Sequence, residues 1–256
     1  MTYIIFGDKG SGAFSAEAAL AEVGAPYEFR TISLDRNEQR DPEYLKVNPS
    51  GKMPALNLPG GEIITESAAI LLTIADRHPD AGLLPPQASF ARAECTRWIV
   101  FLASEVYPMV EISDYPHRFV PPLYSGAREP ESDEAKALKQ RAQERIRERL
   151  LILEKHVAGP WLLSSGFSAA DIYAAMFSRW RNTIGKEWLE AGHIPKLLAI
   201  AKAVSERARI ASVGQRHFGG EAFSSAIPFS ARKGRSSSAS YISRMMSQPP
   251  TNSPFT

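Results

Sequence analysis

The sequence predicts an α/β region followed by an all-α region, and two observations carry this prediction. Up to residue 80, short β-branched and aromatic runs alternate with helical stretches in the order β-α-β-α-β-β-α. A proline-rich break then follows, and beyond it almost every periodic segment is helical. We therefore expect an α/β domain over residues 1–80, a linker over 81–87 and a helical domain over 88–218. The composition of residues 219–256, rich in Ser, Pro and basic residues, predicts a disordered tail.

The first region should form a small mixed sheet covered by helices. "TYIIF" and "YEFRTISL" are typical of strands, and the alanine-rich helix "AFSAEAALAEVG" between them ends at Gly24 as a C-cap. "DPEYLKV" supplies one or two helical turns. "MPALNL" and "EIIT" flank a "PGG" turn, which predicts a hairpin. "ESAAILLTIADRH" closes the region as a helix with Glu66 in its first turn and His78 in its last, as the helix dipole prefers.

Four helical segments make up most of the second region, at residues 89–112, 132–157, 167–180 and 195–208. The second of them is highly charged with one apolar stripe, which indicates a solvent-facing amphipathic helix. In "FSAADI", Ser168 and Asp171 have the spacing of a capping box at the start of the third. We interpret both residues as structural, because this spacing satisfies the helix start reciprocally.

Composition excludes several kinds of function. Of 256 residues 44% are hydrophobic, which is enough to bury a core, and the net charge of +2 is too small to indicate nucleic acid or an anionic membrane as a partner. Cys95 is the one cysteine and the five histidines are scattered, so no metal site is expected. No apolar run reaches the length of a membrane span. A cytoplasmic setting is the expectation.

The stretch "NPSGKMPALNLPGGEIITESAAI", residues 48–70, holds the main functional signal. Pro54 opens a strand and cannot donate to a ladder, so this strand belongs at an edge or bulge. A cis bond before Pro54 would turn the Met53 backbone outward to pair with an extended peptide. Glu66 and Ser67 begin the next helix, where free N–H groups and a hydroxyl favour a carboxylate and Glu66 favours an ammonium group. Such an edge suits an extended ligand with a zwitterionic amino-acid end.

With "NPSGKMPAL", "ESAAIL" and "FSAADI" in this order, residues 1–215 resemble the cytosolic glutathione transferases, bacterial members included. The resemblance implies a thioredoxin-like N-terminal domain followed by an all-helical domain, glutathione as co-substrate, a homodimer, and an electrophile pocket between the domains. It also implies a role in detoxification. Carried over to this chain, Met53 would pair with the cysteinyl part of glutathione ahead of a cis-Pro54, and Glu66 and Ser67 would hold the γ-glutamyl end. Lys52 would lie near the glycine carboxylate, or would be an ordinary loop cation.

Glutathione reacts through its thiolate. A hydrogen bond from one hydroxyl at the start of the first helix contributes enough free energy to stabilise that thiolate. Tyrosine-type members carry that hydroxyl late in the first strand, where this chain has Phe6, and the cysteine of cysteine-type members corresponds to about Gly12 or Ala13. The chain therefore resembles the serine type. Ser11 is the preferred candidate because glycines flank it, and Ser15 is the alternative. The backbone N–H groups of Gly12 or Ala13 are further possible donors.

The electrophile pocket would draw on the first loop and the first long helix of the second domain. Its candidates are Phe14, Trp98, Phe101, Tyr107 and Met109. The Pro- and aromatic-rich insert at residues 114–126 is either a roof over this pocket or a plain surface loop. The expected function is addition of the glutathione thiolate to a hydrophobic electrophile. Two alternatives stay open: a non-catalytic glutathione-binding protein, and a glutathione-dependent isomerase or peroxidase on the same fold.

Overall fold

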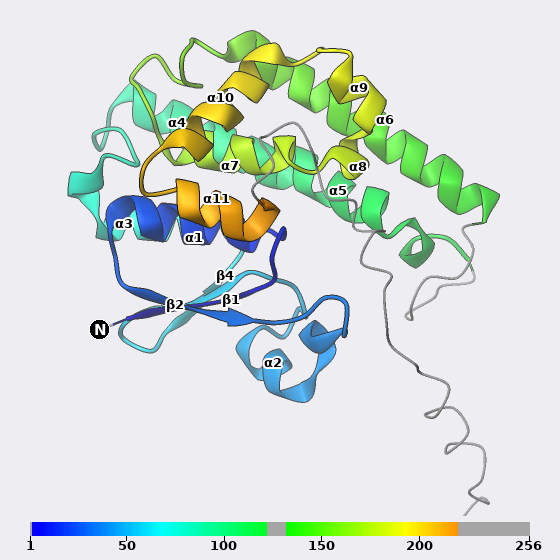
Figure 1. Ribbon diagram of the computed structural model, residues 1–256, viewed down its shortest axis with the longest axis horizontal. Coiled ribbons are helices and arrows are strands. Elements are labelled where there is room, and N and C mark those ends of the chain that lie inside the picture. Colours follow the sequence, from blue (N-terminus) through cyan, green and yellow to red (C-terminus); the bar gives the residue numbers. More distant parts are fainter. Residues whose placement is uncertain (1, 122–131, 220–256) are drawn as a thin grey trace, which may run out of the picture. The chain divides into compact units, whose positions relative to one another are not determined.

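A four-stranded mixed sheet forms the first part of the chain in the computed structural model, which describes residues 2–121 and 132–219 (Figure 1). The strand order is β2-β1-β3-β4. β1 (Tyr3–Gly7) runs parallel to β2 (Tyr27–Thr31) and antiparallel to β3 (Ala55–Asn57), which pairs antiparallel with β4 (Ile63–Thr65). The predicted parallel unit and hairpin are therefore both present. The prediction of an edge strand or bulge after Pro54 is wrong: β3 is an inner strand paired on both sides, because Pro54 precedes the first paired residue, Ala55. Residues 122–126 of the insert and residues 220–256 of the predicted tail lie outside the described residues.

Helices α1 (Ala13–Val23) and α3 (Ser67–Arg77) cover one face of this sheet, while α2 (Pro42–Val47) lies on the other side (Figure 1). Alternation along β1 and β3 directs one apolar set towards α1 and α3, because successive side chains of a strand point to opposite faces. The resulting core is fully buried and includes Ile5, Leu20, Leu56, Ile70 and Ile74.

The helix predicted over residues 89–112 is interrupted. α4 (Phe90–Phe101) and α5 (Tyr107–Asp114) are joined by a π-helical turn over Leu102–Val106. Pro108 lies in the first turn of α5, and its missing N–H cannot continue the α-helical hydrogen-bond ladder. The wider turn changes the direction in which the first residue of α5, Tyr107, projects.

The central helix of the second part is α7 (Ala169–Ser178), in which every residue is buried. The Asp171 carboxylate accepts the Ser168 N–H at 2.8 Å and the Leu162 N–H at 2.7 Å, so the capping box also ties down the preceding loop. α7 packs against α1 and α3 of the first part and against α4 and α10 of the second. The two parts therefore share one apolar core.

The remaining helices include three that the sequence did not predict. α6 (Asp133–His156) and α10 (Pro195–Glu206) match predicted segments. α8 (Arg181–Ile184), α9 (Lys186–Glu190) and α11 (Ala211–Phe218) were not expected. α11 returns from the helical part to lie beside α1 (Figure 1). Short 3-10 turns complete the described elements at Glu38–Arg40, Pro79–Ala81 and Pro116–Arg118.

The architecture is a thioredoxin-like N-terminal domain followed by a helical domain, as the sequence predicts. None of the helices in the described part of the chain is long and apolar enough to cross a membrane.

Candidate functional site

The backbone of Met53 lies two residues before the start of β3. The Met53–Pro54 peptide bond is cis, and the preceding carbonyl, that of Lys52, accepts the Tyr44 hydroxyl and the Asn48 side-chain amide, both at 2.7 Å. Within residues 2–121 and 132–219, no backbone hydrogen bond engages the Met53 N–H or C=O. The Lys52 carbonyl is thus held in place, while the N–H and C=O groups of Met53 are available to a ligand strand.

Glu66 and Ser67 stand at the start of α3, next to the hairpin. The sequence predicts Glu66 inside the first helical turn, whereas the helix begins at Ser67 and Glu66 precedes it with a φ of 64°. A positive φ is costly for a residue with a side chain, and such strain concentrates at functional sites. The Glu66 side chain is exposed, while the Ser67 hydroxyl is buried and bonds the Tyr173 hydroxyl of α7 at 2.9 Å.

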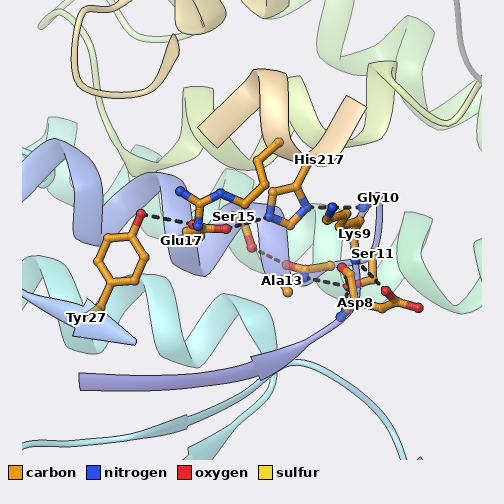
Figure 2. A network of polar contacts seen from close by, with 11 residues as sticks. Asp8, Lys9, Gly10, Ser11, Ala13, Ser15, Glu17, Tyr27 and His217 are labelled. Carbon is orange, nitrogen blue, oxygen red and sulfur yellow. Dashed lines mark hydrogen bonds and ion pairs between the residues drawn. The ribbon is translucent and has the colours of Figure 1, made fainter. Parts of the chain in front are cut away.

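The two candidate serines lie on either side of the start of α1: Ser11 in the loop after β1, and Ser15 within the helix (Figure 2). The Ser11 hydroxyl donates to the Asp8 carbonyl at 2.7 Å and accepts the Ala13 N–H at 3.2 Å. Ser15 is fully buried and donates to the Gly12 carbonyl at 2.9 Å, which is a helix-internal role. The Gly12 N–H, by contrast, has no hydrogen-bond partner among the described residues. In this loop the described hydrogen bonds therefore leave the Gly12 amide open, whereas the Ser11 hydroxyl is engaged with the backbone of Asp8 and Ala13.

The Tyr107 hydroxyl reaches this loop from the helical domain. A Cβ added to Gly12 would overlap the Tyr107 hydroxyl oxygen and would lie 3.2 Å from Pro54 Cδ. The absence of a side chain at Gly12 therefore makes room for Tyr107 beside Pro54. The Tyr107 ring is held by the rings of Phe177 and Trp180, each with its centroid 5.6 Å away.

Burial raises the pKa of the Tyr107 phenol far above its usual value, and Tyr173 and Glu66 raise it further, with a smaller opposing effect of the Ser67 hydroxyl. Burial likewise raises the pKa of Tyr173. Both phenols consequently stay protonated at neutral pH and act as hydrogen-bond donors or acceptors, not as bases. Two phenols of the helical domain thus meet the first domain: Tyr107 lies against Gly12, and Tyr173 bonds the Ser67 hydroxyl.

Lys52 has an ion-pair partner in the second domain. Its ammonium group lies 2.7 Å from the Glu111 carboxylate of α5, and its side chain is 56% exposed. The cation therefore bridges the two domains, on the segment that also carries Met53. A carboxylate ligand at this position would compete with Glu111 for it.

The five candidates for an electrophile pocket do not share one environment. Phe14 is 1% exposed and packs edge-on against His217, while Trp98 is 2% exposed and packs against Phe101 and His156. Phe101, Tyr107 and Met109 are half-buried. Of the five, Tyr107 meets Gly12 with its hydroxyl and Phe14 donates its backbone N–H to the Ser11 carbonyl, while the described contacts of Trp98 and Phe101 lie elsewhere.

Within the described residues, neither a reactive cysteine nor a cluster of metal ligands contributes to this site. Cys95 is fully buried, and burial raises the pKa of its thiol, so it is not a reactive nucleophile. In the described ranges no three His, Cys, Asp or Glu side chains cluster as metal ligands would.

Residues of the helical domain hold the loop that carries Ser11, and the sequence did not identify them. Gly10 receives the Trp180 indole N–H at its carbonyl, at 2.9 Å, and donates its own N–H to His217 at 3.1 Å. His217 also contacts the Glu17 carboxylate of α1 (Figure 2). These residues are up to 207 positions apart, so no local pattern could have identified them.

Two domain families match the chain. Residues 1–76 match the N-terminal domain of glutathione S-transferases, and residues 113–215 match the C-terminal domain. The uncharacterized GST-like protein YncG of Escherichia coli K12 is 30% identical over 215 residues, which are 83% of this chain and 97% of that protein.

Solved structures show the same similarity. A sphingomonad glutathione S-transferase complexed with glutathione has a TM-score of 0.64 at 32% identity, over 83% of this chain and 96% of that one. A glutathione transferase homologue from Sulfitobacter with bound glutathione has a TM-score of 0.72 at 24% identity, over 84% and 97% of the two chains, and supports the fold alone.

Proposed function

Because the chain belongs to the glutathione S-transferase family, we propose that it binds glutathione and stabilises its thiolate for attack on a hydrophobic electrophile. The observation that carries the proposal is the convergence of Gly12, Pro54 and the Tyr107 hydroxyl at one point. Ser11 directly precedes Gly12, and the Ser67 hydroxyl acts on the pKa of the Tyr107 phenol, so we expect one ligand to reach all of these groups. The glutathione bound in the related sphingomonad structure supports the choice of ligand.

Glutathione would bind in an extended conformation beside Met53, just before the start of β3, whose own two sides are already paired with β1 and β4. The Met53 N–H and C=O, which have no backbone partner within the described ranges, would pair with the cysteinyl residue. The γ-glutamyl end would reach Glu66 and Ser67, where the ammonium group meets a carboxylate and the carboxylate meets the start of α3. Lys52 would bind the glycine carboxylate in exchange for Glu111.

The sulfur would then lie next to the Ser11 loop. A free thiol has a pKa near ~8.5, and lowering it by about two units requires roughly 2.7 kcal/mol. One hydrogen bond to an ion contributes about 1.5–3 kcal/mol, and a helix N-terminus roughly 0.3–1 kcal/mol more. The Ser11 hydroxyl, turned from the Asp8 carbonyl to the sulfur, and the Gly12 N–H together supply this amount. Tyr107, kept protonated by burial, is a third possible donor.

The electrophile would approach from the side of the helical domain, where the half-buried Tyr107 and Met109 lie on α5. Catalysis would then consist of holding the two reactants together and stabilising charge on sulfur. We also propose that the protein works as a homodimer, as the family resemblance implies. Neither part of this proposal requires a metal ion.

The deciding experiment measures the ultraviolet thiolate absorbance of bound glutathione against pH. We expect the parent to show a bound-thiol pKa well below that of free glutathione, and Ser11→Ala to raise it by about one unit. Ser205→Ala is the matched control, because that exposed hydroxyl also donates to the carbonyl three residues earlier, at 2.7 Å, but lies on α10.

The other outcomes discriminate between donors and between functions. A rise in Tyr107→Phe but not in Ser11→Ala would assign the hydroxyl to Tyr107. No rise in either variant would leave the Gly12 N–H as the donor. Tight binding with an unshifted thiol pKa in the parent would reject the transferase and favour a non-catalytic glutathione-binding protein.

A further inference from the structure

Gly10, at the tip of the loop that carries Ser11 and Gly12, is held by the helical domain through both of its backbone polar groups. Its N–H donates to His217 Nδ1 at 3.1 Å, and its carbonyl accepts the Trp180 indole N–H at 2.9 Å. Its φ of 73° is one that glycine adopts without strain, and a Cβ there would meet only the His217 carbonyl oxygen, at 3.7 Å. Steric contacts therefore do not fix the position of Gly10. The two hydrogen bonds fix it.

Glu17 determines which nitrogen of His217 carries the proton. Because His217 Nδ1 accepts the Gly10 N–H, it has no proton, and in the neutral ring Nε2 then carries it. Nε2 lies 2.7 Å from the Glu17 carboxylate and donates to it. The second carboxylate oxygen accepts the Tyr27 hydroxyl at 2.9 Å and pairs with Arg216. Glu17 is fully buried, so these three donors compensate its charge (Figure 2).

The His217 ring is also fixed by its apolar neighbours. Phe14 and Phe29 pack edge-on against it, with centroids 5.6 and 5.7 Å away, and the His217 side chain is not exposed at all. The orientation of Nδ1 towards Gly10 is therefore determined on every side: by Glu17 through Nε2 and by aromatic rings on its faces.

The second anchor, Trp180, connects Gly10 with the rest of the site. Its ring centroid lies 5.6 Å from that of Tyr107, whose hydroxyl abuts Gly12. The same indole thus sets the position of Gly10 through its N–H and contacts the phenol that faces Gly12. A shift of this loop would change the distance between the Gly12 N–H and any sulfur held at Met53.

We propose that His217 and Trp180 are positioning residues that hold Gly10 so that the Ser11 hydroxyl and the Gly12 N–H face the sulfur of glutathione. This inference rests on the proposed function. It assigns to the last described helix a role in catalysis through the backbone of a loop more than 200 residues earlier in the chain.

Two substitutions at His217 separate its two hydrogen bonds. His217→Asn places a carbonyl oxygen near the position of Nδ1 and keeps an acceptor for Gly10, but it loses the donor to Glu17. His217→Gln places an amide N–H near the position of Nε2 and keeps the donor to Glu17, but it loses the acceptor for Gly10. Trp180→Phe keeps an aromatic ring and removes only the N–H. His193→Gln is the control, because that exposed imidazole stacks on Trp188 away from the loop.

The first measurement is hydrogen exchange of the Gly10 amide together with the thermal unfolding midpoint. We expect exchange to accelerate by about 3- to 10-fold in His217→Gln, as loss of one hydrogen bond implies, and to stay near the parental rate in His217→Asn and His193→Gln. Unchanged Gly10 exchange in His217→Gln, with the unfolding midpoint retained, would overturn the proposed anchoring.

The second measurement is the bound-thiol pKa and the dissociation constant of glutathione in the same variants. We expect a higher thiol pKa and a lower kcat in His217→Gln and Trp180→Phe, with values near the parent in His217→Asn. Faster Gly10 exchange without any change in thiol pKa, kcat or glutathione Kd would overturn the positioning role. If the parent itself leaves the thiol pKa unshifted, the proposed function fails. The positioning role is then judged on Kd, which must rise in His217→Gln and not in His217→Asn.

Discussion

Gly12 shows how a single position can determine the geometry of the site. Its φ of −57° and ψ of −14° are helical values that alanine adopts easily, so the backbone does not require glycine here. The requirement comes from Tyr107, whose hydroxyl oxygen occupies the space that a side chain would need, close to Pro54. The glycine is therefore explained by a contact with the helical domain, and not by the loop.

Gly12→Ala should consequently keep the fold but displace Tyr107 or the loop. We expect kcat with glutathione to fall by at least tenfold, whereas the free energy of unfolding changes by about 1–3 kcal/mol, the usual cost of overpacking. Adding Tyr107→Phe removes the overlapping oxygen and should restore part of the stability lost. Measuring both single variants and the double variant by chemical denaturation gives the coupling. Additive effects would show that Gly12 and Tyr107 do not contact each other in solution.

At the scale of elements, α7 organises the molecule, and its start is determined by Ser168 and Asp171. Burial raises the pKa of Asp171 to about 6, against the opposing hydrogen bonds from Leu162 and Ser168. The carboxyl group thus has a higher pKa in the folded protein than in the unfolded chain. Its stabilising contribution is complete below the unfolded value of 3.8 and is lost as the pH rises through about 6.

Asp171→Ala should lower the free energy of unfolding by about 2–4 kcal/mol, because it leaves two buried N–H groups, those of Leu162 and Ser168, without an acceptor. In the parent we expect part of the stability to be lost between pH 4 and pH 6, and we expect that slope to disappear in the variant. Urea denaturation at several pH values measures both effects. An identical pH slope in parent and variant would refute the assignment to Asp171.

The sequence of α11 alone does not indicate that this helix contacts the candidate site. It is an eight-residue helix, "ASVGQRHF", with a glycine in its middle and few buried side chains. Such a short helix is marginal by itself and depends on tertiary contacts. Those contacts are with α1, through the Glu17 carboxylate, and they bring His217 to Gly10.

At the scale of the whole molecule, polar contacts join the two domains around the site as well as the apolar core. Ser67 bonds Tyr173, Gly10 bonds Trp180, and Lys52 pairs with Glu111. The first two are buried or partly buried, whereas the Lys52–Glu111 pair is largely exposed. Exposed ion pairs contribute little to stability, about 0–1 kcal/mol, so this pair matters for binding more than for folding.

Glu111→Gln should therefore release Lys52 for the glycine carboxylate of glutathione. We expect the KM for glutathione to fall by about two- to fivefold at low salt, with less effect at high salt because of screening. The unfolding midpoint should change little. Glu105→Gln is the matched control, since Glu105 makes a comparable interhelical ion pair with Arg149, at 2.8 Å. A rise in KM for glutathione in Glu111→Gln would contradict the competition and indicate that the pair orders the site.

Local sequence signals determined much of the fold and one side of the candidate site. Strand alternation, the turn at "PGG" and the cap at Ser168 each act over a few residues, so they can be interpreted without a structure. The proline before β3 predicted an edge strand or bulge, whereas β3 is paired on both sides, which only the sheet order shows. The same is true of the position of Met53 and of Glu66–Ser67. The family resemblance of these segments predicted the thioredoxin-like domain and the helical domain that follows it.

Tertiary structure alone decided what surrounds the Ser11 loop. Pro108 and the π-turn direct Tyr107 to Gly12, and α11 brings His217 to Gly10. These contacts depend on how helices pack across one shared core, where residues far apart in the chain satisfy each other's polar groups. Helical periodicity indicates which face is apolar, but it does not say which distant backbone group a buried histidine or tryptophan will meet.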